Sequence, residues 1–402
     1  MSSISEKMVI TKIEAIALRV PLQFPIMDAV YFKDSRDCCF VKIYTNKGIT
    51  GYGEAITAGG PAVSTKAMID LELAPLLIGE DPSDIEYLWQ KMYHFCWHHG
   101  RRGIVVSAMS GLDIALWDIK GKMAGLPVYK LLGGYQSKIR AYASAGFYST
   151  GNEEEIPKLV ADAEKLVAKG FKGIKLKIGR TMPIPMHPLS FQPGKDLCLF
   201  SLEEDMKRIE AVRQTVGKDI ALMVDANSAY TPYYALQVGR ELEKLGVYFF
   251  EEPISVEDVE GSAALAAALD IQIAGYETEQ TAYGFRHLIE KQAVDIVQPD
   301  VTWSGGITEC RRIAAIAYAY NKICNPHSFT SAFCIAANMH LACSIPNSEY
   351  VEYDQVVANN PLIEKLLKEP IEISKDGYVE HTGKPGIGVE IDEDFFEKYA
   401  VR

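Results

Sequence analysis

The sequence has no long apolar run. Nowhere do 18 consecutive apolar residues occur, so no membrane-spanning helix is predicted. The first ten residues, MSSISEKMVI, lack the basic segment and apolar core that are typical of a secretion signal. These absences predict a cytoplasmic protein with no membrane partner.

Basic charge is also scarce. The chain has 41 lysines and arginines against 53 aspartates and glutamates, which gives a net charge of −12. Because no basic surface for a phosphate backbone is indicated, a nucleic acid partner is not expected. An anionic substrate would need local positive charge from particular lysines and a bound metal.

Cysteine pairs of the CxxC type are missing as well. In a chain of this length, scattered cysteines are typical of reduced core thiols in a cytosolic protein. Neither a disulfide framework nor a zinc site is therefore predicted from the eight cysteines, which are Cys38, Cys39, Cys96, Cys198, Cys310, Cys324, Cys334 and Cys343.

The length of 402 residues predicts one large domain and one smaller domain. Residues 8–20 and 39–56 alternate apolar and polar side chains, which predicts an antiparallel meander with a turn at Asn46-Lys47-Gly48. Between them, residues 21–36 contain two prolines and are predicted to form a loop. Helical periodicity follows over residues 62–125.

Residues 1–135 are accordingly predicted to form a small α+β domain. The strand-like pieces and glycines of the tail, residues 370–402, suggest that it returns to this domain and completes it. The remaining residues, 136–369, are expected to form the larger domain.

A repeating pattern of strand and helix begins at Ile139. It predicts eight strands separated by helices, an arrangement best explained by a (β/α)8-type barrel. The predicted strands end at or near Ala145, Gly179, Asp225, Glu251, Glu277, Asp300, His327 and Glu352.

Three of these strand ends are acids in regular steps of 26 residues: Asp225, Glu251 and Glu277. The carboxyl ends of barrel strands meet over one pocket, so the three carboxylates would repel one another unless a cation lay between them. Hard oxygen ligands in this number suit Mg²⁺. The alternative is three unrelated acids that begin βα loops.

Two lysines, Lys175 and Lys177, lie in the second barrel strand, GIKLKIG. Residues i and i+2 of a strand point to the same side, so both would face the barrel mouth. Adjacent ammonium groups near a divalent cation are expected to lower the pKa of a lysine and make it a usable base. The alternative is a solvated pair on an edge strand.

His327 ends the seventh strand, and Asp300 ends the sixth. Neighbouring strands could place the Asp300 carboxylate against one nitrogen of His327, fixing its tautomer and supporting its protonated form. The seventh strand lies nearly opposite the second, so Lys177 and His327 would flank a substrate from two sides. Taken alone, His327 could equally be a core or loop histidine.

Together these motifs resemble the mandelate racemase subgroup of the enolase superfamily, whose members use a Lys or His base with Mg²⁺. The resemblance rests on Lys-x-Lys, Asp-x-Asn, Glu-Glu-Pro, Gln-Pro-Asp, Pro-His and a late Glu. It covers nearly the whole chain, including the N-terminal segment GLDIALWDIKGKMAG.

The resemblance implies an α+β capping domain over a modified TIM barrel, (β/α)7β, with segment 21–36 covering the site. It implies Mg²⁺ held by Asp225, Glu251 and Glu277. It also implies that Lys177, supported by Lys175, is one acid/base and that the His327–Asp300 pair is the other. Glu352, in its protonated form, would hydrogen-bond the substrate carboxylate or enolate, and Asn227 is similar to a polar family position near the substrate.

The activity predicted first is a carbon–oxygen lyase: dehydration of an aldonate or aldarate sugar acid to a 2-keto-3-deoxy acid in carbohydrate catabolism. Sugar-lactone cycloisomerisation comes second, followed by racemisation or epimerisation of a hydroxy acid. The intact acid set disfavours a non-catalytic binding protein, and a homo-oligomer is expected. Polar and aromatic side chains that suit a polyol are His98, His99, Arg101, Arg102, Tyr148 and Trp303.

Residues 180–200 lengthen the interval after the second barrel strand and include four prolines. A compact barrel has little reason to carry about 20 extra residues here unless they have a purpose. The segment is predicted to be an active-site lid or a subunit contact, with a disordered insertion as the alternative.

Overall fold

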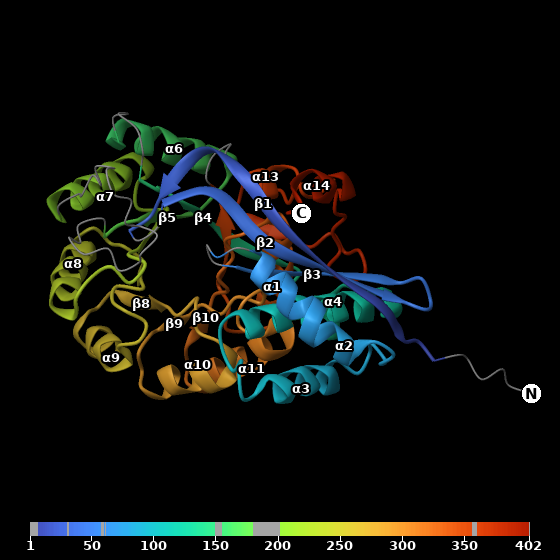
Figure 1. Cartoon of the computed structure of the whole chain (residues 1–402). Helices are drawn as coiled ribbons and strands as arrows, with labels where there is room; N and C mark the ends of the chain where they lie inside the picture. The colour runs from blue at the N-terminus through green and yellow to red at the C-terminus, as the bar shows by residue number, and fades with distance from the viewer. Residues whose placement is uncertain are drawn as a thin grey trace, which may run out of the picture.

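A computed structural model describes residues 7–29, 32–57, 60, 62–148, 155–179, 202–355 and 360–401. The predicted lid or contact segment, residues 180–200, lies outside the described residues. The described chain contains a three-stranded antiparallel sheet and a larger curled sheet ringed by helices (Figure 1). Among its helices, none is long and apolar enough to cross a membrane.

The smaller sheet is the predicted meander. Its strands β1 (Ile10–Met27), β2 (Phe32–Thr45) and β3 (Thr50–Ile56) pair in the order β1-β2-β3. The predicted turn joins β2 to β3, and its Gly48 has a φ of 75°, a conformation that glycine adopts without strain.

The prediction that residues 21–36 form a loop is wrong. Strands β1 and β2 pair on both sides of an irregularity between Pro21 and Ile26, with Val20 opposite Arg36 and Ile26 opposite Lys33. Pro21 and Pro25 are tolerated because β1 is an edge strand, where a missing N–H removes no ladder bond on the open side. The resulting β1–β2 hairpin extends from the small sheet to the barrel (Figure 1).

Helices cover the small sheet, and the longest of them, α4, lies directly against β3. Gly51 and Gly53 of β3 allow this contact, because a Cβ atom there would come within 2.2 Å of the Ala115 carbonyl oxygen and 1.9 Å of the Gly111 carbonyl oxygen. The helical segments are α1 (Ala62–Met68), the π-helix η1 (Ile69–Leu73), α2 (Ala74–Leu77), α3 (Ile85–Cys96), α4 (Ile104–Ala124) and α5 (Val128–Leu131).

The larger sheet is the predicted (β/α)7β barrel. Its eight parallel strands run in the order β10-β9-β8-β7-β6-β5-β4-β11. They are β4 (Lys138–Ala145), β5 (Gly173–Lys177), β6 (Ala221–Asp225), β7 (Phe249–Glu251), β8 (Gln272–Gly275), β9 (Ile296–Val297), β10 (Ile323–Cys324) and β11 (Tyr350–Asp354).

Among the described residues, one helix follows each of the first seven barrel strands. These helices are α6 (Glu155–Lys169), α7 (Leu202–Val216), α8 (Pro232–Lys244), α9 (Val259–Ala268), α10 (Thr281–Glu290), α11 (Gly306–Ala319) and α12 (Ala332–Ala342). Between β10 and β11 the ring is closed by one backbone hydrogen bond, from the Cys324 N–H to the Asn347 carbonyl at 2.7 Å, and by the Asn325 Oδ1, which accepts the backbone N–H groups of Glu349 and Tyr350.

The barrel is a packed core and not a pore. A separate apolar cluster fills its interior below the strand ends, formed by Tyr142, Met223, Phe249, Ala274, Ile296 and Tyr350. Inward-facing side chains from several strands form such layers in TIM barrels. Because this apolar cluster fills the interior, the polar side chains of the barrel meet at the carboxyl ends of the strands.

The tail after β11 contacts both sheets. It contains α13 (Pro361–Glu364), then β12 (Tyr378–Glu380), which pairs antiparallel with β4, and α14 (Glu393–Tyr399). Beyond α14, the Val401 N–H donates to the Ala17 carbonyl at 2.8 Å, on the small sheet. The domain boundaries 1–135, 136–369 and 370–402 stay a prediction.

A pair of buried histidines ties this tail to α12. The His340 and His381 rings stack at 4.2 Å. The His340 Nδ1 accepts the Tyr129 N–H at 3.0 Å, so it must be unprotonated, and its Nε2 donates to the Ile387 carbonyl. Burial lowers the pKa of His381 to about 4 and that of His340 well below its usual range.

We expect acid to destabilise the fold through these histidines. Between about pH 6.5 and pH 4 the unfolded chain binds a proton that folded His381 does not, so stability falls as pH falls, by about 3 kcal/mol in total from His381. His381→Phe should flatten this slope in urea denaturation, whereas the exposed control His98→Ala should not. Equal slopes in wild type and His381→Phe would refute the assignment.

Candidate active site

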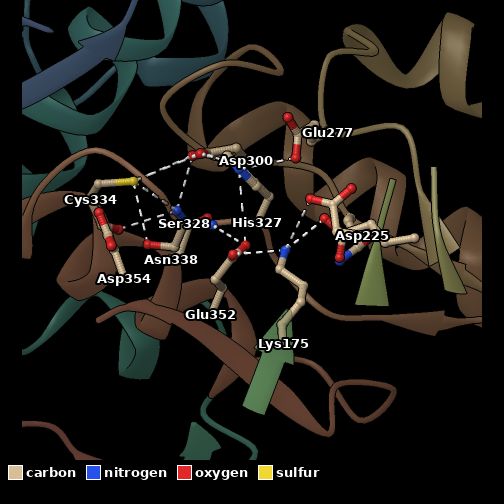
Figure 2. A network of polar contacts seen from close by, with 12 residues as sticks. Lys175, Asp225, Glu277, Asp300, His327, Ser328, Cys334, Asn338, Glu352 and Asp354 are labelled. Carbon is tan, nitrogen blue, oxygen red and sulfur yellow. Dashed lines mark hydrogen bonds and ion pairs between the residues drawn. The ribbon is translucent and has the colours of Figure 1, made fainter. Parts of the chain in front are cut away.

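Three carboxylates converge at the carboxyl ends of β6, β7 and β8. Asp225 and Glu251 end their strands, and Glu277 follows β8 by two residues. Ligand oxygens of the three lie within 4.8 Å of one another. Asp225 and Glu251 are fully buried, while the Glu277 side chain is 15% exposed. Figure 2 shows Glu277 and Asp225 beside His327 and Lys175. The sequence-predicted trio is therefore brought together, and metal binding by it stays a prediction.

The second glutamate of the Glu-Glu-Pro motif has a different position. The Glu252 Oε1 accepts the backbone N–H groups of Tyr276 and Glu277 at 3.1 and 3.2 Å. Both Glu252 and Tyr276 have positive φ values, 38° and 69°. Such strained residues persist where the surroundings fix them, often at active sites. Glu252 thus fixes the turn that carries Glu277, a role that the sequence analysis did not find.

Lys175 and Lys177 project from β5 into the same buried space, as their spacing predicts. The Lys175 Nζ lies 2.6 Å from the Glu251 Oε1 and 2.8 Å from the Glu352 Oε1. Lys177 forms a close ion pair with Asp225. The two ammonium groups therefore neutralise much of the charge of the surrounding carboxylates.

The lowered lysine pKa was predicted for a site that holds a divalent cation, and it stays a prediction. Among the protein's own groups, the balance of charges acts in the other direction. Burial lowers the pKa of Lys177, but the carboxylates of Asp225 and Glu277 outweigh burial and the charge of Lys175, so the pKa lies above its usual value. The pKa of Lys175 is also raised, because Glu251 and Glu352 outweigh its burial. The prediction took account of the adjacent ammonium group and a divalent cation, but not of the number of carboxylates that face each lysine.

His327 faces the trio from the opposite side. Its Nδ1 lies 2.9 Å from the Asp300 Oδ2, and its Nε2 lies 3.2 Å from the Glu277 Oε2 (Figure 2). Burial lowers the pKa of His327, but Glu277 and Asp300 outweigh it and raise the pKa to about 10. The Asp300 carboxylate also accepts hydrogen bonds from the Thr302 N–H and the Asn338 Nδ2.

The protonated form of Glu352 was predicted for a site that holds Mg²⁺ and substrate, and it stays a prediction. The protein's own groups favour the ionised form. Burial raises the pKa of Glu352, but the charges of Lys175 and His327 outweigh burial and lower it to about 2. Glu352 lies inside β11 and accepts the Ser328 N–H at 3.3 Å. It is thus an ionised acceptor at the base of the site, between the lysine and the histidine.

Two aromatic side chains that the sequence analysis did not predict also lie at the site. Phe147 and Phe329 stack at 5.8 Å, and the Lys177 Nζ lies 5.4 and 5.7 Å from their ring centres. The Arg36 guanidinium of the hairpin lies 3.7 Å over the Phe329 ring and pairs with Asp354 at 3.1 Å. No local motif marks these residues, since the long hairpin brings Arg36 to the barrel.

The three predicted substrate-binding residues differ in position. The Trp303 ring lies 6.2 Å from the His327 ring, beside the site. The Asn227 N–H donates to the Asp225 Oδ1 at 2.8 Å, and its own buried Oδ1 has no hydrogen-bond partner among the described residues. Tyr148, by contrast, is 1% exposed, and its hydroxyl donates a hydrogen bond to Asp205 at 2.8 Å. This hydroxyl therefore already has a partner within the protein. Substrate binding by all three stays a prediction.

Family comparisons agree with this geometry. Residues 10–133 match the model of the mandelate racemase/muconate lactonizing enzyme N-terminal domain, and residues 158–395 match the model described as enolase C-terminal domain-like. The chain belongs to the mandelate racemase family of the enolase superfamily. The resemblance inferred from the motifs is confirmed, and the chain is an enzyme of this superfamily.

Relatives within the mandelate racemase family differ in activity. The chain is 42% identical over 358 residues to an arabinonate dehydratase of Saccharolobus solfataricus, covering 89% of each chain. It is 32% identical to a D-galactarolactone cycloisomerase of Agrobacterium fabrum, covering 98% of this chain and 99% of the relative. A racemase structure from Streptomyces coelicolor with bound magnesium superposes with a TM-score of 0.85 at 30% identity, covering 98% of this chain and all of that one.

In this member of the mandelate racemase family, Asn338 of α12 positions the histidine–aspartate pair. Its Nδ2 donates to the Asp300 Oδ1, and its Oδ1 accepts the Val301 N–H, both at 3.0 Å. Hydrogen bonds to charged groups contribute about 1.5–3 kcal/mol. Asn338→Leu should therefore lower kcat roughly 10- to 100-fold with little change in KM.

A matched control for Asn338→Leu is Asn347→Leu, which removes another partly buried amide near the opposite ends of the strands. Asn347→Leu should leave kcat close to the wild-type value when both variants are assayed at a temperature where they are folded. Equal losses of kcat in the two variants would assign Asn338 a purely structural role.

Proposed function

We propose that the protein is a Mg²⁺-dependent dehydratase of aldonate or aldarate sugar acids that forms 2-keto-3-deoxy acids. The observation that carries this proposal is that a lysine and a histidine, both able to transfer protons, contact different members of one carboxylate trio. Lys177 lies against Asp225, and the His327 Nε2 lies against Glu277. The name of the arabinonate dehydratase relative, at 42% identity, supports the same chemistry.

The donor set fits Mg²⁺. Asp225, Glu251 and Glu277 offer three carboxylate oxygens within 4.8 Å of one another, and hard oxygen donors are the ligands that Mg²⁺ prefers. The magnesium described in the racemase structure supports the assignment. When bound, the ion would supply electrostatic stabilisation for a substrate carboxylate and for the negative charge that develops on it.

The residues of the chain account for the proton transfers. Whichever of Lys177 and His327 faces the α-carbon removes its proton, in the unprotonated form that a cation offsetting the charges of Asp225 and Glu277 would favour. The C–H electrons then form a carbon–carbon double bond. The residue on the other face protonates the β-hydroxyl, the C–O bond breaks and water leaves. The resulting enol takes up a proton at C3 and becomes the 2-keto-3-deoxy acid. For His327, Asp300 keeps the imidazole oriented throughout.

Sugar-lactone cycloisomerisation is the second candidate. It is favoured by the D-galactarolactone cycloisomerase relative, which the chain matches over 98% of its own length. Both activities begin with removal of a proton next to a carboxylate, so the same lysine and histidine would serve either one. They differ in the bond that breaks next, which depends on the substrate.

The test is a panel of aldonates, aldarates and sugar lactones with Mg²⁺, in which products are detected by carbonyl derivatisation and mass. A 2-keto acid lighter than an open-chain sugar acid by one water is expected. The Lys177→Ala/His327→Asn double variant, purified identically, controls for host dehydratases. Consumption of lactones alone, without change in mass, would favour the cycloisomerase. Inversion of a hydroxy acid alone would favour a racemase or epimerase.

A further inference from the structure

A second cluster of potential metal ligands lies in the N-terminal part of the chain and shares no residue with the active site. It consists of Glu72, Cys96 and His99, whose ligand atoms lie within 4.8 Å of one another. Glu72 comes from the π-helix η1, Cys96 is the last residue of α3, and His99 follows in the next turn. We propose that these three side chains form a binding site for a borderline-soft divalent cation of the Zn²⁺ class.

The local backbone sets this arrangement. After α3 the N–H groups of His99 and Gly100 both donate to the Cys96 carbonyl, at 3.0 and 2.8 Å, which turns His99 back over Cys96. Glu72 reaches the same point from η1, and its Oε2 lies 2.8 Å from the His99 Nε2. Single π-helical turns are often found at functional sites.

The donor types select the class of metal. A thiolate, an imidazole and a carboxylate suit Zn²⁺, which binds such sets tetrahedrally with water as the fourth ligand. Mg²⁺ prefers oxygen ligands alone, so the two clusters of this chain would take different ions. A cation at this position would also lie at the C-terminus of α3, where the helix dipole favours positive charge.

An ordinary surface ion pair between Glu72 and His99 would explain their contact but not the thiol beside it. Cys96 is fully buried, whereas the His99 side chain is 48% exposed and leaves a route from solvent. Burial and the charge of Glu72 raise the pKa of Cys96 to about 11, so a metal would have to displace a proton from the thiol. Binding should therefore strengthen as pH rises.

The sequence analysis predicted no zinc site because CxxC pairs are missing, and the proposed site differs from the pattern considered there. Only one cysteine is needed here, in the spacing Cys96-x-x-His99. The third donor lies 24 residues earlier, at Glu72. Folding of η1 against the end of α3 is what brings it within reach.

Cobalt(II) titration of the full-length protein, with Mg²⁺ in excess, tests this proposal. Co²⁺ bound by a thiolate gives a ligand-to-metal charge-transfer band in the near ultraviolet, and the carboxylate trio carries no sulfur that could produce one. We expect one equivalent of Co²⁺ to generate the band and Zn²⁺ to displace it. Glu277→Gln and Cys343→Ser should retain the band.

Variants of the cluster complete the test. Cys96→Ser should abolish the band, and the exposed substitutions His99→Gln and Glu72→Gln should weaken Co²⁺ binding at least about tenfold without affecting folding. No band in the wild type, or a band that is unchanged in both Cys96→Ser and His99→Gln, would overturn the proposal. Neither result would bear on the proposed dehydratase activity, because that activity depends on other residues.

Discussion

Lys177→Ala should lower turnover of the true substrate by about 10²–10⁴-fold, the contribution typical of a general acid or base. His327→Asn should have an effect of similar size, because Lys177 and His327 approach the carboxylate trio from opposite sides. Lys172→Ala, an exposed lysine just before β5, is the matched control and should retain full turnover.

The two variants should differ in α-proton exchange with D₂O. Replacing the residue that faces the α-proton should stop both exchange and turnover. Replacing the other should stop water loss while exchange continues, since the enolate can still form. If both variants kept near-normal turnover, the resemblance would describe the fold and not the mechanism.

Removal of the metal should have the second largest effect. A chelator should abolish activity and Mg²⁺ should restore it, because the ion contributes several kcal/mol of charge stabilisation, roughly 10³-fold or more in rate. Glu277→Gln should lower activity comparably and weaken Mg²⁺ binding measured by calorimetry.

The control for Glu277→Gln is Glu279→Gln, two residues along the same loop, where the carboxylate pairs with Arg102 at 3.3 Å. It should leave both Mg²⁺ binding and activity intact. Full activity in excess chelator, or in Glu277→Gln, is incompatible with a metal held by the trio.

Periodicity was sufficient to predict the barrel. Several strands are short apolar runs, and the ends predicted at Asp225 and Glu251 coincide with those of β6 and β7. The β1–β2 hairpin could not be predicted in the same way, because Pro21 and Pro25 are usual signs of a loop. Whether a proline is tolerated depends on its strand lying at a sheet edge, and strand order is a tertiary property.

The residues of the site could be predicted from the sequence, but their protonation states could not. Spacing placed Lys175, Lys177 and His327 correctly, because strand ends meet at one face. Their protonation could not be read from the sequence, since it depends on how many anions surround each cation. Three carboxylates lie within 4.0 Å of the Lys175 Nζ, and only the fold reveals this number.

Side chains outside the motifs were the least predictable part. Substrate contact by Tyr148 stays a prediction, and the sequence did not indicate that its hydroxyl donates to Asp205 of α7. Phe329 was not expected at the site, and Arg36 was expected there only as part of the segment 21–36 that the resemblance places over the site; the two stack beside Lys177. Arg36 and Phe329 are separated by almost 300 residues, so neither a motif nor a period relates them.

The most direct test of the central claim is proton NMR of the reaction with a sugar acid that turns over, carried out in D₂O with Mg²⁺. Loss of the α-proton and the β-hydroxyl should give a 2-keto-3-deoxy acid with one solvent deuteron at C3. Deuterium at C2 of a product that keeps all its hydroxyl groups would contradict dehydration and indicate racemisation or epimerisation instead.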